Sequence, residues 1–181
     1  MAGIWTNNWR AFRNIMVMGS HYNGFSTITN ENGVTVENYY DPNLSATTPL
    51  GNYNNDDLYS NAMNFIKLGT GNTAPTATDY NVTRPTGLSY LSCTMSAPVY
   101  DDNTATVTRS IAVAVQNTGS ESVTIREWGL FGAVRTLVYG SGIIARALLY
   151  REVLTTPVTL TQYQAATLTL TVSLTLSDPV S

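Results

Sequence analysis

Thr167-Leu-Thr-Leu-Thr-Val-Ser-Leu-Thr-Leu176 has the clearest strand periodicity in the chain, and the fold class follows from it. Apolar side chains occupy every second position, and small hydroxyl side chains fill most of the positions between them. Residues of an extended chain point alternately to the two faces of a sheet, so this spacing gathers the aliphatic groups on one face. Threonine and valine also favour a pleated backbone. The stretch therefore predicts a long strand with one buried face, which needs paired neighbours and a second layer over it.

The overall composition is that of a globular chain with few charges. Its 181 residues are enough for one domain with a hydrophobic core, and only 12% of them are charged. A net charge of −3 gives no basic surface for nucleic acid. The sequence has no basic amphipathic segment for a membrane surface, and no run of about 18 apolar residues that would insert into one. We therefore expect partners that are proteins or glycans.

The cysteine content and the N-terminus bear on where the chain is made. Cys93 is the only cysteine, so no intrachain disulfide can form, which fits folding in a reducing cytosol. The first residues lack the charged segment followed by an apolar segment that is typical of a signal peptide. We expect synthesis in the cytoplasm without export by such a signal.

Further strands follow from alternating apolar residues separated by turn signals such as Asn32-Gly33. In the strand predicted over residues 104–116, Arg109 falls on the apolar face, so it should lie near a strand end or find a partner. Together the strands predict an all-β fold, an antiparallel β-sandwich or jelly roll. The predicted strands are residues 25–29, 34–40, 63–68, 88–96, 104–116, 123–131, 134–139, 143–149 and 167–176.

One short helix is predicted over residues 8–18, where Trp9, Phe12 and Met16 share a face and Asn8 is placed to cap the start. It either plugs one end of the sandwich or forms an arm that docks on a neighbouring subunit. Residues 1–62 are interpreted as this arm, a hairpin and an Asn/Tyr-rich loop, packed on a β-sandwich core of residues 63–181. We expect one compact domain overall.

Catalytic and metal-binding patterns are weak. His21 is the only histidine and would have to serve any Ser-His-Asp or Cys-His arrangement from a turn near the N-terminus. The acidic doublets at 56–57 and 101–102 place neighbouring side chains on opposite faces of a strand, which does not suit paired catalytic acids. Residues 52–56 have part of the oxygen spacing of a calcium loop but lack its glycine and closing glutamate. We predict no catalytic residue, no metal and no cofactor.

Four segments of the chain follow one another in a recognisable order. They are Phe65-Ile-Lys-Leu-Gly-Thr-Gly-Asn-Thr-Ala-Pro75, Asn117-Thr-Gly-Ser120 with Val123-Thr-Ile-Arg-Glu-Trp-Gly-Leu-Phe-Gly132, Ile144-Ala-Arg-Ala-Leu-Leu149, and Pro157-Val-Thr-Leu160 leading into the Thr/Leu strand. In this order they resemble a recurrent family of small structural proteins of tailed bacteriophages. The chain departs from the family pattern at Gln164-Ala165, where a glycine usually precedes the last strand, and the first 60 residues match nothing that we can name.

The residues of these segments suggest structural roles. Gly129 and Gly132 flank Phe131, which predicts a bend that drops an aromatic side chain into the core. Arg126, Glu127 and Arg146 are candidates for ion pairs across neighbouring strands.

The resemblance implies a non-enzymatic virion protein, a tail, fibre or baseplate component that associates with itself and with other virion proteins. A capsid decoration or head-fibre protein is one alternative, and a module that binds a host receptor or glycan is another. Aromatic side chains carry much of the energy of protein interfaces, so they are the candidate contact residues. These residues are Trp5, Trp9, Phe12, Tyr39, Tyr40, Tyr53 and Tyr59.

Overall fold

The computed structural model describes residues 3–9, 26–38, 66–138 and 141–175. The described chain is all-β, with antiparallel sheets and a short helical segment at residues 7–9, so the predicted fold class is confirmed. The remainder of the helix predicted over residues 8–18 lies outside the described residues. The chain divides into two compact units, and each is described by itself. No helix among the described residues has the length and apolar character needed to cross a membrane.

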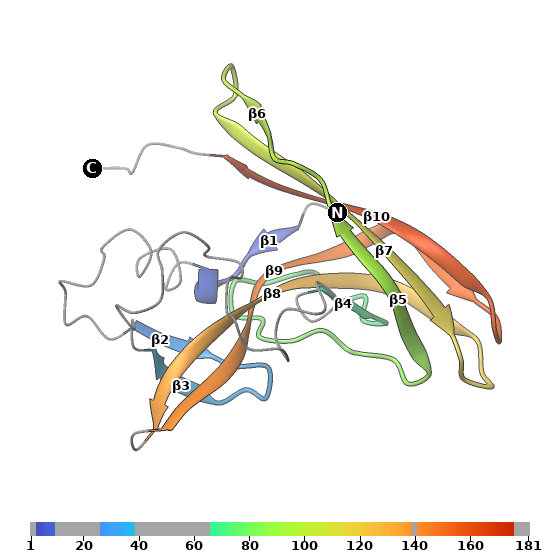
Figure 1. The fold of residues 1–181 in the computed structure, drawn as a ribbon, viewed down its shortest axis with the longest axis horizontal. Coiled ribbons are helices and arrows are strands. Elements are labelled where there is room, and N and C mark those ends of the chain that lie inside the picture. The colour runs from blue at the N-terminus through green and yellow to red at the C-terminus, as the bar shows by residue number, and fades with distance from the viewer. Residues whose placement is uncertain (1–2, 10–25, 39–65, 139–140, 176–181) are drawn as a thin grey trace. The chain divides into compact units, whose positions relative to one another are not determined.

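The first unit contains a four-stranded sheet in the order β1-β9-β8-β4 (Figure 1). The strands predicted at 123–131 and 134–139 are one continuous strand, β8, and β9 likewise runs through Pro157 without a break. These four strands are β1 (Ile4–Trp5), β4 (Ile66–Gly69), β8 (Val123–Val138) and β9 (Ser141–Leu160).

Gly129 and Gly132 both lie inside this continuous strand, whereas separate strands were expected on either side of Gly132. A side chain at Gly129 would come within 2.6 Å of Leu148 Cδ1, and one at Gly132 within 2.8 Å of Leu149 Cδ1. The glycines therefore leave room for leucines of β9. Phe131 is fully buried, as expected, and packs with Val82 and Leu148.

A two-stranded hairpin also belongs to the first unit. It pairs β2 (Ser26–Thr29) with β3 (Thr35–Asn38), which confirms the predicted hairpin. Gly33 has a φ of +77°, a conformation that side chains disfavour, and the side-chain oxygen of Asn30 accepts hydrogen bonds from the backbone of Asn32 and Val34. Ile28 packs with Ala147 and Leu149 of β9.

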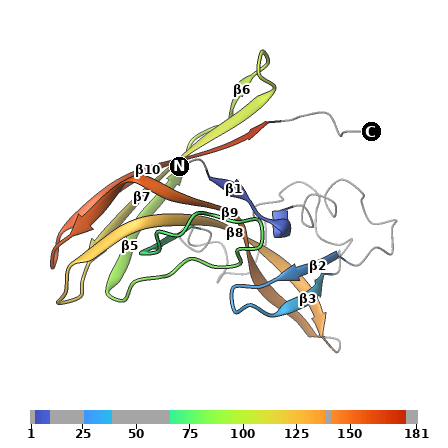
Figure 2. The ribbon, with the colours of Figure 1, turned by 180° about the vertical axis from the view of Figure 1, so that it is seen from behind.

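The second unit is a sheet in the order β10-β7-β5, in which β6 also pairs with β7; these strands lie side by side in both views (Figures 1 and 2). Leu168 and Leu170 are buried while the threonines between them are exposed, so the alternation in the Thr/Leu stretch has the predicted result. Arg109 finds a partner, because its Nε donates to the carbonyl of Ser96 at 2.9 Å. The strands are β5 (Leu88–Met95), β6 (Val99–Asp101), β7 (Thr106–Asn117) and β10 (Ala165–Thr175).

The turn before β10 contains Tyr163, a residue other than glycine that has a left-handed φ of +61°. The side chain of Gln164 accepts a hydrogen bond from the backbone of Thr161 at 3.0 Å and closes the turn. The buried side chain of Asn117 donates to the carbonyls of Leu160 and Glu121, which ties the start of this turn to the end of β7.

Candidate functional site

The most highly organised polar site in the described chain surrounds Glu127 of β8 and Arg151 of β9, which lie on neighbouring strands. Both side chains are buried, with 0% and 5% of the residue surface exposed. A buried carboxylate and a buried guanidinium are costly unless they are paired and hydrogen-bonded. The sequence suggested Arg126 or Arg146 as the partner of Glu127, but the structure pairs it with Arg151.

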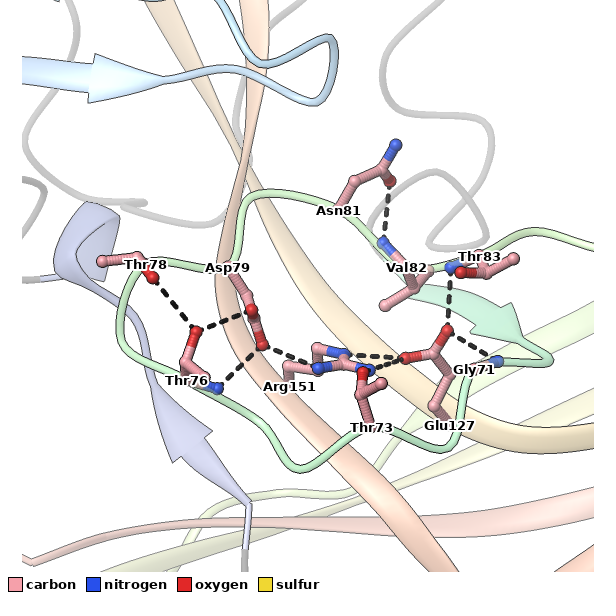
Figure 3. Close-up of polar contacts among 10 residues, drawn as sticks. All are labelled: Gly71, Thr73, Thr76, Thr78, Asp79, Asn81, Val82, Thr83, Glu127 and Arg151. Atoms are coloured by element: carbon pink, nitrogen blue, oxygen red, sulfur yellow. Dashed lines mark hydrogen bonds and ion pairs between the residues drawn. The ribbon is translucent and has the colours of Figure 1, made fainter.

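Glu127 is saturated by hydrogen bonds (Figure 3). Its Oε1 accepts from the backbone N–H of Gly71 at 3.0 Å and from that of Thr83 at 2.8 Å. Its Oε2 accepts a hydrogen bond from Nε of Arg151 at 2.7 Å and lies 2.6 Å from Nη2 of the same residue. The carboxylate thus binds both ends of the connection between β4 and the segment at residues 82–83. With both oxygens occupied and no exposed surface, it can hold this connection but offers no free lone pair to a substrate.

Arg151 extends the network away from Glu127. Its Nη1 donates to Oδ2 of Asp79 at 2.7 Å, and its Nη2 donates to the hydroxyl of Thr73 at 3.2 Å. Each guanidinium nitrogen therefore has a partner, in the fork geometry that suits arginine. Burial opposes the charge of Arg151, but hydrogen bonds and charge from Asp79 and Glu127 leave its pKa raised.

Asp79 closes the network within its own loop. It accepts hydrogen bonds from the backbone N–H of Thr76 at 2.9 Å and from the Thr76 hydroxyl at 2.7 Å. Partial burial opposes its ionisation, but these bonds and the neighbouring Arg151 more than compensate, so the pKa of Asp79 is lowered. Three side chains, those of Glu127, Arg151 and Asp79, thus hold the loop from residue 70 to residue 83 in place.

The glycines of the first family-like segment are explained by the same site. Gly69 lies directly opposite Glu127 in the β4–β8 pairing. A Cβ at Gly69 or at Gly71 would come within 2.5 Å of Oε1 of Glu127. These glycines make room for the carboxylate of Glu127.

A cluster of aromatic side chains lies elsewhere in the first unit and includes two of the predicted contact residues. The ring centroids of Trp5 and Trp9 lie 4.6 Å apart, and those of Trp5 and Tyr150 lie 5.1 Å apart. The ring centroids of Tyr150 and Trp128 lie 5.2 Å apart. Trp5 and Trp9 are half-buried against Leu149 and its neighbours, so both contribute to the core of this unit.

Glu152 provides the polar partner of this cluster. Its Oε2 accepts from Nε1 of Trp128 at 3.2 Å and from the hydroxyl of Tyr150 at 3.0 Å. Burial, together with the charge of Glu152 and the bond to it, raises the pKa of Tyr150. The tyrosine is therefore a protonated donor under ordinary conditions.

Two polar residues fasten the N-terminal segment. The hydroxyl of the buried Thr6 donates to the carbonyl of Leu149 at 3.2 Å. The side chain of Asn8 accepts from the N–H of Thr29 and donates to its carbonyl, both at 2.8 Å. Asn8 therefore continues the pairing of β2 and is engaged there, whereas the sequence suggested a helix cap.

The remaining predicted site residues fall outside the described chain or in ordinary turns. The acidic doublet at 101–102 spans the end of β6 and the turn that follows it, and Asp101 accepts from the Thr104 hydroxyl at 2.8 Å. Within the described ranges, no group of three or more His, Cys, Asp or Glu side chains is placed to hold a metal ion. The predicted residues outside the described ranges are Phe12, His21, Tyr39, Tyr40, Tyr53 and Tyr59 and the doublet at 56–57.

Sequence analysis missed Arg151, Asp79 and Thr6. A signal for Asp79 is present in the Thr76-x-x-Asp79 spacing, which is typical of a side chain that closes a turn on its own backbone. Arg151 follows the apolar run of residues 147–150 in β9. A charged residue next to such a run is expected to form a buried ion pair, but the sequence does not identify the residue with which it pairs.

Comparison with known proteins gave no match: no family model, no curated protein and no solved structure is significantly similar to the chain.

Proposed function

We propose that the chain is a non-enzymatic structural protein of a tailed-bacteriophage particle, acting by subunit association as a component of the tail, fibre or baseplate. The support from the sequence is the order of the four family-like segments between residues 65 and 176.

The observation that carries the proposal is the meeting of the first two segments in one buried network. Gly71 belongs to the first segment and Glu127 to the second, and the two are hydrogen-bonded at 3.0 Å. Arg151, two residues beyond the third segment, pairs with Glu127. Residues that carry the resemblance therefore maintain the fold, which is what a family defined by architecture would require of them.

The exposed surface of the second unit is a further support. On β7 and β10, the face that bears the hydroxyl groups contains Thr, Ser, Ala and Gln and no charged residue. A surface of this kind can be covered by another subunit without desolvating charges. We expect other virion proteins and further copies of this chain as partners.

The test locates the protein on particles of the phage that encodes it. Purified particles are examined by mass spectrometry for peptides of the chain and by immunogold electron microscopy, with antibody pre-adsorbed on the purified chain as the control. Label on the tail or its tip is the expected result. Label over the head would replace the tail assignment with capsid decoration, and the absence of its peptides from purified particles would overturn the virion assignment.

A further inference from the structure

We propose that the edge of β10 on the side away from β7 is a self-association surface, on which β10 of a second copy pairs in antiparallel orientation. The inference deepens the proposed function, from which the expectation of a homo-oligomer comes, by naming the surface responsible. It begins with the sheet order, in which β10 is a terminal strand: among the described strands, only β7 pairs with it. In an antiparallel strand, half of the backbone N–H and C=O groups point away from the existing neighbour. Residues 166–172 therefore present a row of backbone groups to the outer edge.

The sheet edges of the two units differ in how they are protected. Edge strands normally carry charges, prolines, bulges or very short lengths that prevent further pairing. β1 has two residues, and β4 has four, including Lys67. On the other side of the second unit, β5 has a register shift between Tyr90 and Ser92, and Pro98 lies between β5 and β6.

β10 has none of these protections. Its eleven residues, from Ala165 to Thr175, include no charged residue, no proline and no glycine. Its register against β7 runs without a shift along the whole strand. A long, regular and uncharged edge is the kind that accepts another strand.

The alternation in β10 makes it complementary to itself. Antiparallel pairing about Thr171 places Thr171 opposite its own copy, and Leu170 opposite Val172 of the second copy. Pairing about Leu170 likewise places hydroxyl residues opposite hydroxyl residues and apolar residues opposite apolar ones. A slip by one residue would put leucines opposite threonines and is disfavoured. The strand chemistry therefore favours a second β10 as the partner, and the register about Thr171 is the one that the burial of the apolar face selects.

The same chain already contains pairs of the kind expected at this interface. Where β10 meets β7, the side-chain oxygens of Thr108 and Ser173 lie 3.0 Å apart, and those of Thr106 and Thr175 lie 3.3 Å apart. Cross-strand hydroxyl pairs of this type stabilise antiparallel sheets.

The burial of the apolar face agrees with the same arrangement. Leu168 and Leu170 are buried, whereas Val172 and Leu174 are only half-buried. In the register centred on Thr171, Leu170 of the second copy lies beside Val172 and Leu168 beside Leu174. Each copy thus covers the less buried end of the other.

The opposite edge is a weaker candidate, although it contains exposed apolar residues. Val99 and Tyr100 are highly exposed, but they are consecutive residues of β6 and therefore point to opposite faces. Together with the register shift in β5, this arrangement does not give one continuous surface for a partner.

The experiment uses charge complementation on the full-length chain. Sedimentation velocity over a range of concentrations measures the dimer dissociation constant of the wild type, Thr171→Lys, Thr171→Glu and an equimolar mixture of the two variants. The matched control is Thr94→Lys, an exposed threonine on the opposite edge strand, β5. Circular dichroism verifies that each variant is folded, and Thr171→Arg with Thr171→Asp replaces the first pair of variants should either of those fail to fold.

We expect a concentration-dependent wild-type dimer, a dissociation constant raised by more than about tenfold in each single variant, and recovery of the dimer in the mixture. Thr94→Lys should behave as the wild type. A wild type that stays monomeric, a Thr171→Lys variant that dimerises normally, or a mixture that stays monomeric would each overturn the inference. Peptides of the chain in purified particles together with a monomeric purified chain would leave the virion proposal standing and remove only this interface.

Discussion

The network around Glu127 and the sheet containing β10 solve different structural problems with opposite chemistry. In the first, a buried carboxylate and a buried guanidinium fasten a fourteen-residue loop, residues 70–83, through backbone N–H groups that a strand ladder does not reach. In the second, regular strands satisfy one another, and uncharged hydroxyl pairs are sufficient. Buried charges thus hold the irregular backbone of this loop, whereas hydroxyl pairs are sufficient between the regular strands β7 and β10.

This difference predicts that stability is concentrated in few groups at the network and spread over many in the β10 sheet. Substitutions in the two regions should therefore differ widely in cost. For each variant, urea denaturation measures the free energy of unfolding relative to the wild type.

Glu127→Ala should have the largest effect, lowering the free energy of unfolding by about 3–5 kcal/mol. The substitution leaves Arg151 buried without its main partner and removes the acceptor of the Gly71 and Thr83 N–H groups. Glu127→Gln retains one acceptor oxygen and should fall between this variant and the wild type. Glu121→Ala, at an exposed position, is the control and should change the value by less than about 0.5 kcal/mol. A cost below about 1 kcal/mol for Glu127→Ala would mean that the network is not the fastening that we describe.

Gly71→Ala should cost about 1–3 kcal/mol, because the new methyl group would collide with Oε1 of Glu127, which its hydrogen bonds prevent from moving. The cause is steric, so the cost should depend on the carboxylate. In a Glu127→Ala background the same substitution should be much less harmful, which a double-mutant cycle measures. Equal costs in the two backgrounds would show that the glycine is needed for another reason.

Acidification should weaken the loop through Asp79. Its pKa is lowered below the ordinary value of 3.8, so the ionised carboxylate adds stability that is fully present above about pH 4. That stability is lost as the pH falls through the native pKa. Asp79→Asn should therefore cost about 1 kcal/mol near neutral pH, with the difference from wild type shrinking as the pH falls below 3.8. Asp102→Asn, in an exposed turn, is the control, and a pH-independent difference for Asp79→Asn would contradict the assignment.

Thr108→Val should have the smallest effect, about 0.5 kcal/mol, because it removes a single cross-strand bond to Ser173. Thr169→Val is the matched control, since Thr169 lies opposite Ala112, which has no hydroxyl to offer. The two variants should differ by the value of that bond alone. A cost for Thr108→Val comparable with that of Glu127→Ala would remove the contrast between the two regions.

The parts of the fold that could be predicted are those with a strictly local cause. The hairpin around Gly33 and the alternation of β10 depend on backbone conformation and side-chain parity, which neighbouring residues determine. The continuity of β8 was not predicted. Gly132 resembles a strand end in the sequence. In the structure, Gly129 and Gly132 leave room for Leu148 and Leu149, which are distant in the chain.

The site shows the same limit. The glycines of the first segment form part of the resemblance, but the carboxylate that requires them lies more than fifty residues away. Trp5 and Trp9 were singled out for their aromatic character, and the structure adds that they pack on Leu149 and Tyr150 of β9. Aromatic residues have large surfaces to bury in a core or an interface alike, so composition does not distinguish the two.

Strand periodicity and composition can be read residue by residue, so an antiparallel all-β fold with few charged residues could be inferred from the sequence alone. Only the tertiary structure decided that Glu127 pairs with Arg151 and not with Arg126 or Arg146, and that Asp79 completes the network. A charge in a strand requires some partner, but which partner comes within reach depends on strand order and register, and these are set by the packing of the whole sheet.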